Sequence, residues 1–335
     1  MLMGKSVIPR RRVAAFVALS SVSRLPFTGG LLADGIASSM TNKTVLQTAL
    51  FSSDYSSASL SVFHLKESVG STQDEARAIL HARDASDRER CIAVIADEQT
   101  QGRGTQGRKW EGGSRKGNLY LTIGIPFDSI RSKITLLPLQ IAVLIAQRVK
   151  RLLDACPEGE DDGVRRQIGA KTTVKWPNDV LVNEKKLAGT LIENESVDQR
   201  TWFLIGIGVN VAFAPGLTES PGKQIREATC IQDFCPSTLP ESTALALGTD
   251  MARGLVEWAL DTETDRFVKE TKVIEEWKAL SEFGKTYELR GEVVDENSGT
   301  YQGEAVTLVD IQDDGQLLVR GVDGRERLLI ADYMF

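Results

Sequence analysis

Residues 174–195 read Val-Lys-Trp-Pro-Asn-Asp-Val-Leu-Val-Asn-Glu-Lys-Lys-Leu-Ala-Gly-Thr-Leu-Ile-Glu-Asn-Glu. Short apolar runs flank the turn at 177–179, and Asn183-Glu184 marks a second turn before another apolar run. This pattern predicts a β-meander that presents Lys175 and Asp179 near one turn and Lys186 on the next strand.

The next apolar run, residues 202–211, is predicted to be a third strand of the same sheet. It carries Gly206 and Gly208, although strand interiors favour β-branched residues. Glycine weakens a strand, so its presence here indicates either a bulge or tight packing, or the close approach of a ligand. Lys186-Leu-Ala-Gly189 places a cation beside a further glycine, where a ligand could approach the backbone closely.

Upstream, residues 101–117 read Gln-Gly-Arg-Gly-Thr-Gln-Gly-Arg-Lys-Trp-Glu-Gly-Gly-Ser-Arg-Lys-Gly. Glycines let backbone N–H groups converge on a ligand, and the neighbouring arginines and lysines add positive charge. The loop therefore suits a phosphate or a carboxylate. A solvated basic hairpin is the alternative if the loop is considered alone.

Two common nucleotide-binding motifs are excluded for this loop. Residues 102–107 fit G-x-G-x-x-G, but the following segment, 118–126, has the composition of a strand, and a dinucleotide-binding fold needs a helix there. A P-loop needs Lys-Ser/Thr after its last glycine, whereas this chain has Arg108-Lys109-Trp110.

Taken together, these segments resemble the biotin–protein ligases, also called holocarboxylase synthetases. The resemblance rests on the ordered motifs Ser71-Thr72-Gln73, Gly102–Trp110, Lys175–Asp179, Lys186–Gly189 and Gly206–Asn210, and it extends over roughly residues 62–335. It implies that biotin, ATP and Mg²⁺ give biotinyl-5′-AMP and pyrophosphate. The biotinyl group then passes to one lysine of a biotin carboxyl-carrier domain, in carboxylases such as acetyl-CoA carboxylase.

The resemblance also implies roles for individual residues of this chain. Arg103, Asp179 and Lys186 match the catalytic positions. The positions that match biotin-binding residues are Ser71, Thr72, Gln73, Gln99, Gly102, Arg103, Trp110, Lys186, Gly189 and Gly206. Those that match ATP- or adenylate-binding residues are Arg103, Gly104, Thr105, Arg108, Lys109, Trp110, Lys175, Asn178, Asp179, Lys186, Gly208 and Asn210. We expect no side chains dedicated to holding a metal.

One loop position departs from the family pattern. Many members have a further arginine where this chain has Thr105. Threonine carries no charge to neutralise a phosphate or a carboxylate, and neighbouring Gln106 does not restore one. We therefore expect either weaker retention of the adenylate or compensation by Arg108 or Lys109.

The whole pattern predicts an α+β fold: a catalytic domain with a mixed β-sheet flanked by helices, of the biotin/lipoate ligase type. Helices are expected from Ser71 or Thr72 to about 84, and over 135–155, 243–260 and 265–280, with a strand over 92–96. From Lys285 onward, short strands with hairpin signals at Asp314-Gly315 and Asp323-Gly324 predict a small β-barrel, which the resemblance implies is SH3-like. The predicted domains are 61–283 and 284–335, and 157–169 is expected to be a mobile surface insertion.

Composition limits the function classes. A net charge of −6 and a pI near 5.3 argue against nucleic-acid binding, and residues 1–60 show no helix–turn–helix pattern such as repressor members of the family carry. The short apolar run at 13–19 is too short to span a bilayer, so no membrane partner is expected. Four scattered cysteines and two histidines form no zinc-binding spacing, which favours a reduced intracellular protein.

The amino-terminal segment has a different composition. Residues 1–53 contain six basic residues and a single acidic one, Asp34, and serine is frequent. This composition is typical of an organelle transit peptide. We therefore predict that residues 1–60 are a disordered leader directing the chain to a mitochondrion or a plastid; the alternative is an untargeted tail on a cytoplasmic protein.

Two other functions remain open at this stage. Lipoate–protein ligases share the fold and the adenylation chemistry, but their loop normally has a serine-flanked triple glycine, unlike residues 102–110. A non-catalytic biotin- or nucleotide-binding regulator is the other, and the presence of Arg103, Asp179 and Lys186 counts against it.

Overall fold

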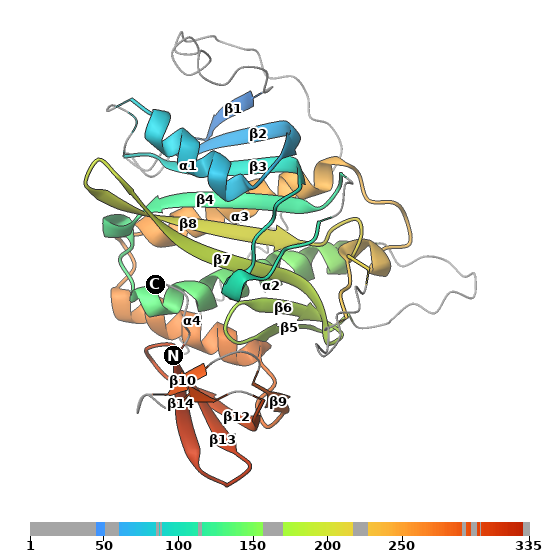
Figure 1. Cartoon of the computed structure of the whole chain (residues 1–335), viewed down its shortest axis with the longest axis vertical. Helices are drawn as coiled ribbons and strands as arrows, with labels where there is room; N and C mark the ends of the chain where they lie inside the picture. The colour runs from blue at the N-terminus through green and yellow to red at the C-terminus, as the bar shows by residue number, and fades with distance from the viewer. Residues whose placement is uncertain are drawn as a thin grey trace, which may run out of the picture. The chain divides into compact units, whose positions relative to one another are not determined.

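The core of the structure, a computed structural model, is an eight-stranded mixed sheet in the order β1-β2-β3-β4-β8-β7-β6-β5 (Figure 1). Only the neighbours β2 and β3 run parallel; all other pairs are antiparallel. The strands are β1 Val45–Leu50, β2 Leu60–Val69, β3 Cys91–Gln99, β4 Leu119–Pro126, β5 Thr172–Lys175, β6 Asp179–Val182, β7 Lys185–Val197 and β8 Arg200–Val209.

The structure describes residues 45–50, 60–84, 87, 89–112, 116–156, 170–216, 227–289, 293–295, 300–301 and 303–330. Most of the predicted leader and the predicted insertion at 157–169 therefore lie outside the described residues. Within the predicted leader, Val45–Leu50 differ from the expectation of disorder, because they form edge strand β1 against β2.

The sheet is covered on both faces, which explains why residues 91–96 of the central strand β3 are apolar on both sides of the sheet. Along β3, Cys91, Ala93 and Ile95 enter one buried cluster, whereas Ile92, Val94 and Ala96 enter another. This alternation is the period of two that a strand imposes on its side chains.

One face is covered by α1, Thr72–Ala82, which connects the parallel strands β2 and β3. Its buried residues Ala76, Ile79 and Leu80 pack in the smaller cluster. The helix begins where predicted: the Ser71 hydroxyl accepts a hydrogen bond from the Gln73 N–H, the usual N-cap contact.

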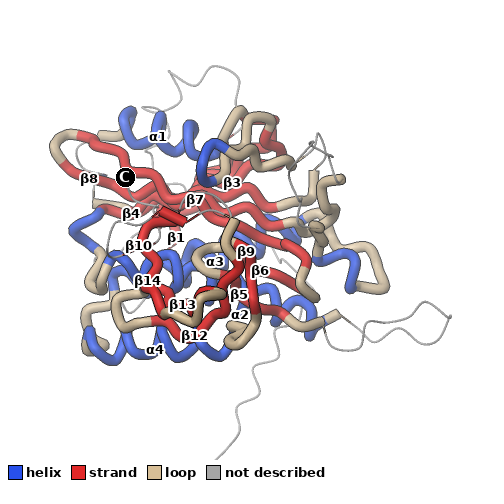
Figure 2. The backbone as a smooth tube through the Cα atoms, turned by 60° about the horizontal axis from the view of Figure 1, so that its bottom comes forward, coloured by secondary structure: helices blue, strands red, loops and turns tan. Residues whose placement is uncertain are grey.

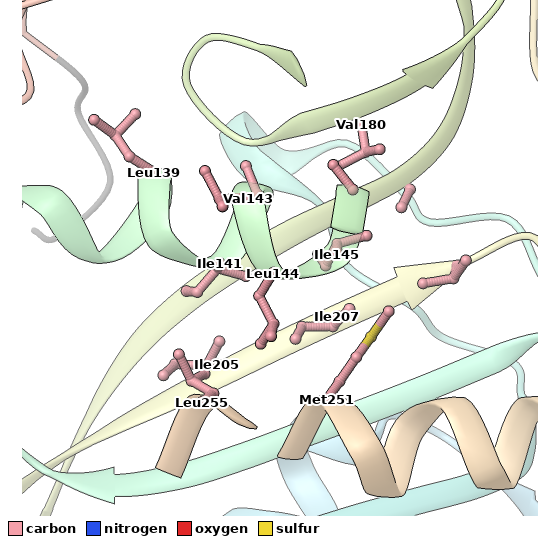
Figure 3. Packing of buried hydrophobic residues seen from close by; sticks show 14 of the residues in the cluster. Leu139, Ile141, Val143, Leu144, Ile145, Val180, Ile205, Ile207, Met251 and Leu255 are labelled. Atoms are coloured by element: carbon pink, nitrogen blue, oxygen red, sulfur yellow. The ribbon is translucent and has the colours of Figure 1, made fainter. Parts of the chain in front are cut away.

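The other face is covered by α2, Leu137–Ala155, and α3, Ser242–Leu260 (Figure 1). Pro138 is tolerated because it lies in the first turn of α2, where its missing N–H would have no helical partner. Figure 3 shows Leu144 of α2 and Met251 and Leu255 of α3 gathered against Ile205 and Ile207 of β8.

Beyond α4, Arg266–Leu280, the chain forms the second, antiparallel sheet, in the order β11-β10-β14-β13-β12-β9 (Figure 2). Its strands are β9 Thr286–Glu288, β10 Val293–Asp295, β11 Thr300–Tyr301, β12 Ala305–Ile311, β13 Leu317–Gly321 and β14 Glu326–Ile330. The two predicted hairpins are confirmed, with Gly315 and Gly324 at positive φ between successive strands.

The cysteine prediction is wrong for one pair. Cys156, at the end of α2, forms a disulfide with Cys235, which follows the short 3₁₀ turn Ile231–Phe234, whereas Cys91 and Cys230 are buried free thiols. The two bonded residues are 79 apart in the chain, so spacing alone carried no signal of the pairing.

Candidate active site

A pocket opens on the face of the sheet that α1 covers. Its walls come from the start of α1, from the loop 103–110, and from β4, β7 and β8. The side chains and backbone that line it belong to Ser71, Thr72, Gln73, Gln99, Arg103, Gly104, Thr105, Arg108, Lys109, Trp110, Tyr120, Leu121, Asn178, Lys186, Gly189, Thr190, Leu191, Gly206, Ile207 and Gly208.

A buried polar network forms the end of the pocket beside α1. The Thr72 N–H and hydroxyl both donate to Oε1 of Gln99, at 2.9 and 3.2 Å, and the Thr122 hydroxyl donates to that of Thr72. Gln73 Nε2 donates to the carbonyls of Leu191 and Leu204, each at 3.3 Å. These amide and hydroxyl groups offer both donors and acceptors to a polar ligand.

The glycines of β7 and β8 make room for side chains rather than bulges. A Cβ on Gly208 would lie 2.4 Å from Cε2 of Trp110, and one on Gly189 would lie 3.2 Å from Cζ3 of the same indole. A Cβ on Gly206 would lie 3.1 Å from the Gln73 amide carbon. Trp110 and Gln73 therefore occupy space that only glycine leaves free.

Lys186 and Asp179 form the charged centre of the site. Lys186 Nζ lies 2.7 Å from Asp179 Oδ1 and 5.6 Å from the centroid of the Trp110 ring. The backbone of Lys186 is fixed from outside the sheet, because its N–H donates to the Glu227 carbonyl and its carbonyl accepts from the Thr229 N–H. The predicted meander is confirmed here, since β6 and β7 place the two side chains together.

The glycine-rich loop is a narrow hairpin across the mouth of the pocket. Arg103 and Lys109 form an antiparallel bridge, and Gly104 N–H donates to the Arg108 carbonyl at 2.7 Å. A 3₁₀ turn, Thr105–Gly107, forms the tip. The Arg108 guanidinium donates to the Thr105 carbonyl and, at 2.6 Å, to its hydroxyl, so the uncharged residue at 105 is in direct contact with the next cation of the loop.

Arg103 is bound to protein carboxylates. Its guanidinium contacts Asp74 of α1 and Glu193 of β7. The hydrogen bond from Arg103 is the largest cause of a lowered pKa at the Asp74 carboxyl, and the same pairing raises the pKa of Arg103. Sequence reasoning missed Asp74 and Glu193. On β7, Glu193 follows Gly189 by four residues and Leu191 by two. Because side chains alternate between the two faces of a strand, Glu193 lies on the same face as these pocket residues, and this spacing could have identified it from the sequence.

Four residues assigned from the sequence are not part of the pocket lining. Gly102 packs against Trp110 and Gln99: a Cβ there would be 2.5 Å from the Trp110 carbonyl oxygen and 2.6 Å from the Gln99 amide nitrogen. Lys175 Nζ lies over the ring of Tyr287, 5.6 Å from its centroid, and Asn210 is buried and donates to the Thr229 carbonyl. Asp179 reaches the site through its ion pair with Lys186.

Five lining residues were not expected from the sequence: Tyr120, Leu121, Thr190, Leu191 and Ile207. Tyr120 is fully buried; its hydroxyl donates to the Gly112 carbonyl, and burial raises the pKa of the phenol to about 12. It therefore fixes the far end of the glycine-rich loop as a neutral hydrogen-bond donor. A tyrosine within an apolar strand does not by itself distinguish this role from ordinary packing.

Among the described residues, no group of three or more His, Cys, Asp or Glu side chains is arranged to hold a metal ion. The described helices also include none that is long and apolar enough to cross a membrane. The pocket thus combines a polar end, an aromatic ring seated on glycines, and a Lys–Asp pair under a cationic loop. This arrangement suits a ligand with a polar head, an apolar middle and an anionic end.

Comparison with known proteins agrees with this geometry. A family model described as "Biotin/lipoate A/B protein ligase family" matches residues 67–210. The bifunctional ligase/repressor BirA of Bacillus subtilis is 31% identical over an alignment of 189 residues, which covers 47% of this chain and 53% of that protein. This chain therefore spans about half the length of that relative.

Two further proteins match over more of their length. The biotin–[acetyl-CoA-carboxylase] ligase of Paracoccus denitrificans is 28% identical over 249 residues, covering 72% of this chain and 89% of that protein. A crystal structure of biotin protein ligase from Leishmania major in complex with biotinyl-5-AMP is 32% identical, with a TM-score of 0.51, and covers 81% of this chain and 98% of that one.

Proposed function

The chain belongs to the biotin–protein ligase family, and we propose on this basis that it activates biotin with ATP to biotinyl-5′-AMP and transfers the biotinyl group to a lysine of a carrier domain. The observation that carries the proposal is the convergence of four distant segments on one pocket: 71–73, 103–110, 186–191 and 206–208. The polar end would receive the ureido head of biotin, and the cationic end its carboxylate and the α-phosphate.

Lys186 is the residue best placed for the first step. In this step a carboxylate oxygen of biotin attacks the α-phosphorus of ATP, and the bond to the pyrophosphate leaving group breaks. Both reactants are anionic, so a fixed cation lowers their repulsion and stabilises the charge that develops on the phosphoryl oxygens. The ion pair with Asp179 and the contact with Trp110 hold the Lys186 ammonium in the pocket before the ligand binds.

Asp179 is suited to the second step. The amine of the acceptor lysine attacks the acyl carbon of biotinyl-5′-AMP, the C–O bond to AMP breaks, and the amine loses a proton. A carboxylate at this position can orient the attacking amine and accept that proton. Since Asp179 lies beside Lys186 rather than in the pocket lining, it would act at the edge of the site, where a second protein substrate can enter.

Mg²⁺ is proposed to enter with ATP. Magnesium keeps several waters and binds largely through substrate phosphates, so it does not need a cage of protein side chains. The acceptor is proposed to be a biotin carboxyl-carrier domain, as the name of the Paracoccus relative indicates for that protein. The net charge of −6 gives no basic footprint, which fits a protein substrate better than a nucleic acid.

Two structural proposals accompany the function. The small sheet, β9 to β14, is proposed to close into an SH3-like barrel; contacts between β9 and β11, its outer strands, in an experimental structure are the check. Residues 1–60 are proposed to direct the chain to a mitochondrion or a plastid, on the basis of their excess of basic over acidic residues. A fluorescent reporter fused behind these residues should enter the organelle, and a diffuse cytosolic signal rejects the leader.

The decisive test of the activity is ATP–pyrophosphate exchange with biotin and with lipoate in parallel, using the full chain. Exchange that depends on biotin, followed by labelling of a carrier-domain lysine, is the expected result. Exchange with lipoate alone assigns the chain to the lipoate ligases, and exchange with neither identifies a binding protein without ligase activity.

A further inference from the structure

Arg103 belongs to a closed ring of four alternating charges at the edge of the pocket. Its Nη1 lies 2.8 Å from Oδ2 of Asp74, and its Nη2 lies 3.2 Å from Oε2 of Glu193. Arg77, one helical turn after Asp74, contacts the same two carboxylates, at 2.9 and 3.1 Å. Each carboxylate therefore bridges both guanidinium groups, and the ring as a whole is neutral.

The ring uses most of the hydrogen-bonding capacity of Arg103. Arginine has five N–H donors. In Arg103, Nη1 and Nη2 donate to the two oxygens of Asp74, while Nε and Nη2 donate to the two oxygens of Glu193. A single N–H is left. Arg103 therefore already makes its bidentate hydrogen bonds with protein carboxylates and has no second N–H with which to bind a ligand carboxylate or phosphate in that way.

The ring also joins three walls of the pocket. Arg103 comes from the glycine-rich loop, and Asp74 and Arg77 come from α1, whose first residues form the polar end. Glu193 comes from β7, the strand that carries Lys186. A second contact supports the ring, because Arg77 also bonds Glu195, which in turn accepts from His81 at 2.8 Å.

We propose that Arg103 is a positioning residue, which acts through Asp74, Arg77 and Glu193 to fasten the glycine-rich loop over the pocket. The anionic end of the ligand is then held by Lys186. This assignment rests on the proposed function, and it replaces the direct contact with the ligand that the sequence resemblance implies for Arg103.

The two roles predict opposite effects of removing a ring carboxylate. If Arg103 binds the ligand directly, Asp74→Asn and Glu193→Gln free its guanidinium and remove a negative charge beside an anion site, so binding of an anionic ligand strengthens. If the ring positions the loop, the same variants release the loop and binding weakens. Both substitutions keep the size of the side chain, and the two residues lie on different elements.

The first measurement is hydrogen exchange of the ligand-free full chain, which needs no activity. The amides of Gly104 and Trp110 are bonded within the loop, to the carbonyls of Arg108 and Gly102. If the ring fastens the loop, amide hydrogen exchange over residues 102–110 should be at least about fivefold faster in both variants than in the wild type. A factor of this size corresponds to the loss of one partly exposed ion pair. Exchange in β4 serves as the internal check of folding.

The matched control is Asp128→Asn, which removes an exposed carboxylate from its ion pair with Arg200, away from the ring. It should exchange like the wild type over 102–110. Wild-type exchange in both ring variants would overturn the proposal, whether or not the chain proves to be a biotin ligase.

The second measurement is the dissociation rate of labelled biotinyl-5′-AMP from the same proteins. Dissociation at least about fivefold faster in Asp74→Asn and in Glu193→Gln, with Asp128→Asn unchanged, supports the positioning role. Slower or unchanged dissociation in the ring variants shows that Arg103 binds the ligand itself. If the wild type binds no biotinyl-5′-AMP, the proposed function fails, and the exchange result still decides whether the ring holds the loop.

Discussion

Replacing Gly208 with alanine tests whether the glycines of β8 exist to seat the Trp110 indole. The new Cβ would lie 2.4 Å from Cε2 and 2.6 Å from Cζ2 of Trp110. Restoring ordinary contact requires the ring to move by about 1 Å, and a misplacement of that size can cost about 100-fold in rate. We therefore expect kcat/KM for biotin-dependent pyrophosphate exchange to fall by about 100-fold, equivalent to about 2.7 kcal/mol of transition-state stabilisation.

The fold should tolerate this change. Gly208 has no positive φ, and alanine in a strand interior is favoured over glycine by about 0.5–1 kcal/mol. Urea unfolding should therefore show a stability that is not reduced. Gly216→Ala is the matched control, because a Cβ at that position meets nothing within 4 Å.

A double variant makes the argument stricter. If the loss comes from the displaced indole, Gly208→Ala combined with Trp110→Ala should be no slower than Trp110→Ala alone, since the ring that collides is already absent. The reasoning is refuted if Gly208→Ala retains activity within about threefold of wild type, or if its effect simply adds to that of Trp110→Ala.

Three further outcomes are expected. Lys186→Ala should slow biotin-dependent exchange by about 10²–10³-fold, and a loss of only a few-fold would show that the lysine is surface charge. Thr105→Arg should slow dissociation of labelled biotinyl-5′-AMP by about tenfold and reduce stray biotinylation of bystander lysines; an unchanged rate would mean that Arg108, which contacts Thr105, already compensates. Cys156→Ser should lower the free energy of unfolding by up to about 4 kcal/mol, because the disulfide to Cys235 closes a loop of 79 residues; equal urea midpoints with and without reductant would contradict this.

Several residues that line the pocket could be singled out from the sequence because each has a strong local signal. Glycine inside a strand, as at Gly206 and Gly208, has few explanations, and the structure shows one of them, tight packing, because Gln73 and Trp110 lie against these glycines. The meander 174–195 was predictable because its turns and apolar runs alternate clearly, and they place Lys186 beside Asp179.

What could not be predicted depends on contacts between distant segments. The pairing of Arg103 with Asp74 and Glu193 joins three elements, and no local pattern identifies which carboxylates a loop arginine will meet. Lys175 belongs to the same motif as Asn178, but it is the last residue of the four-residue strand β5, and its ammonium lies over the ring of Tyr287 rather than in the pocket. The disulfide between Cys156 and Cys235 could not be predicted for the same reason, because the spacing of two cysteines in the sequence does not show whether they lie close together in the fold.

The central pairing of β4 with β8 has a consequence for how the protein is made. Tyr120 lies opposite Gly208 and Thr122 opposite Gly206. The floor of the pocket therefore joins two strands that are far apart in the sequence, with all the elements between β4 and β8 separating them. Such long-range pairing forms late, because a large loop must close before any contact compensates for its entropy. The proposed ligand, biotin, would therefore have no pocket to bind on the nascent chain until β8 has been synthesised and paired. A ligand of this pocket can raise the free energy of unfolding of the finished protein by mass action, but it cannot serve as a template for its folding.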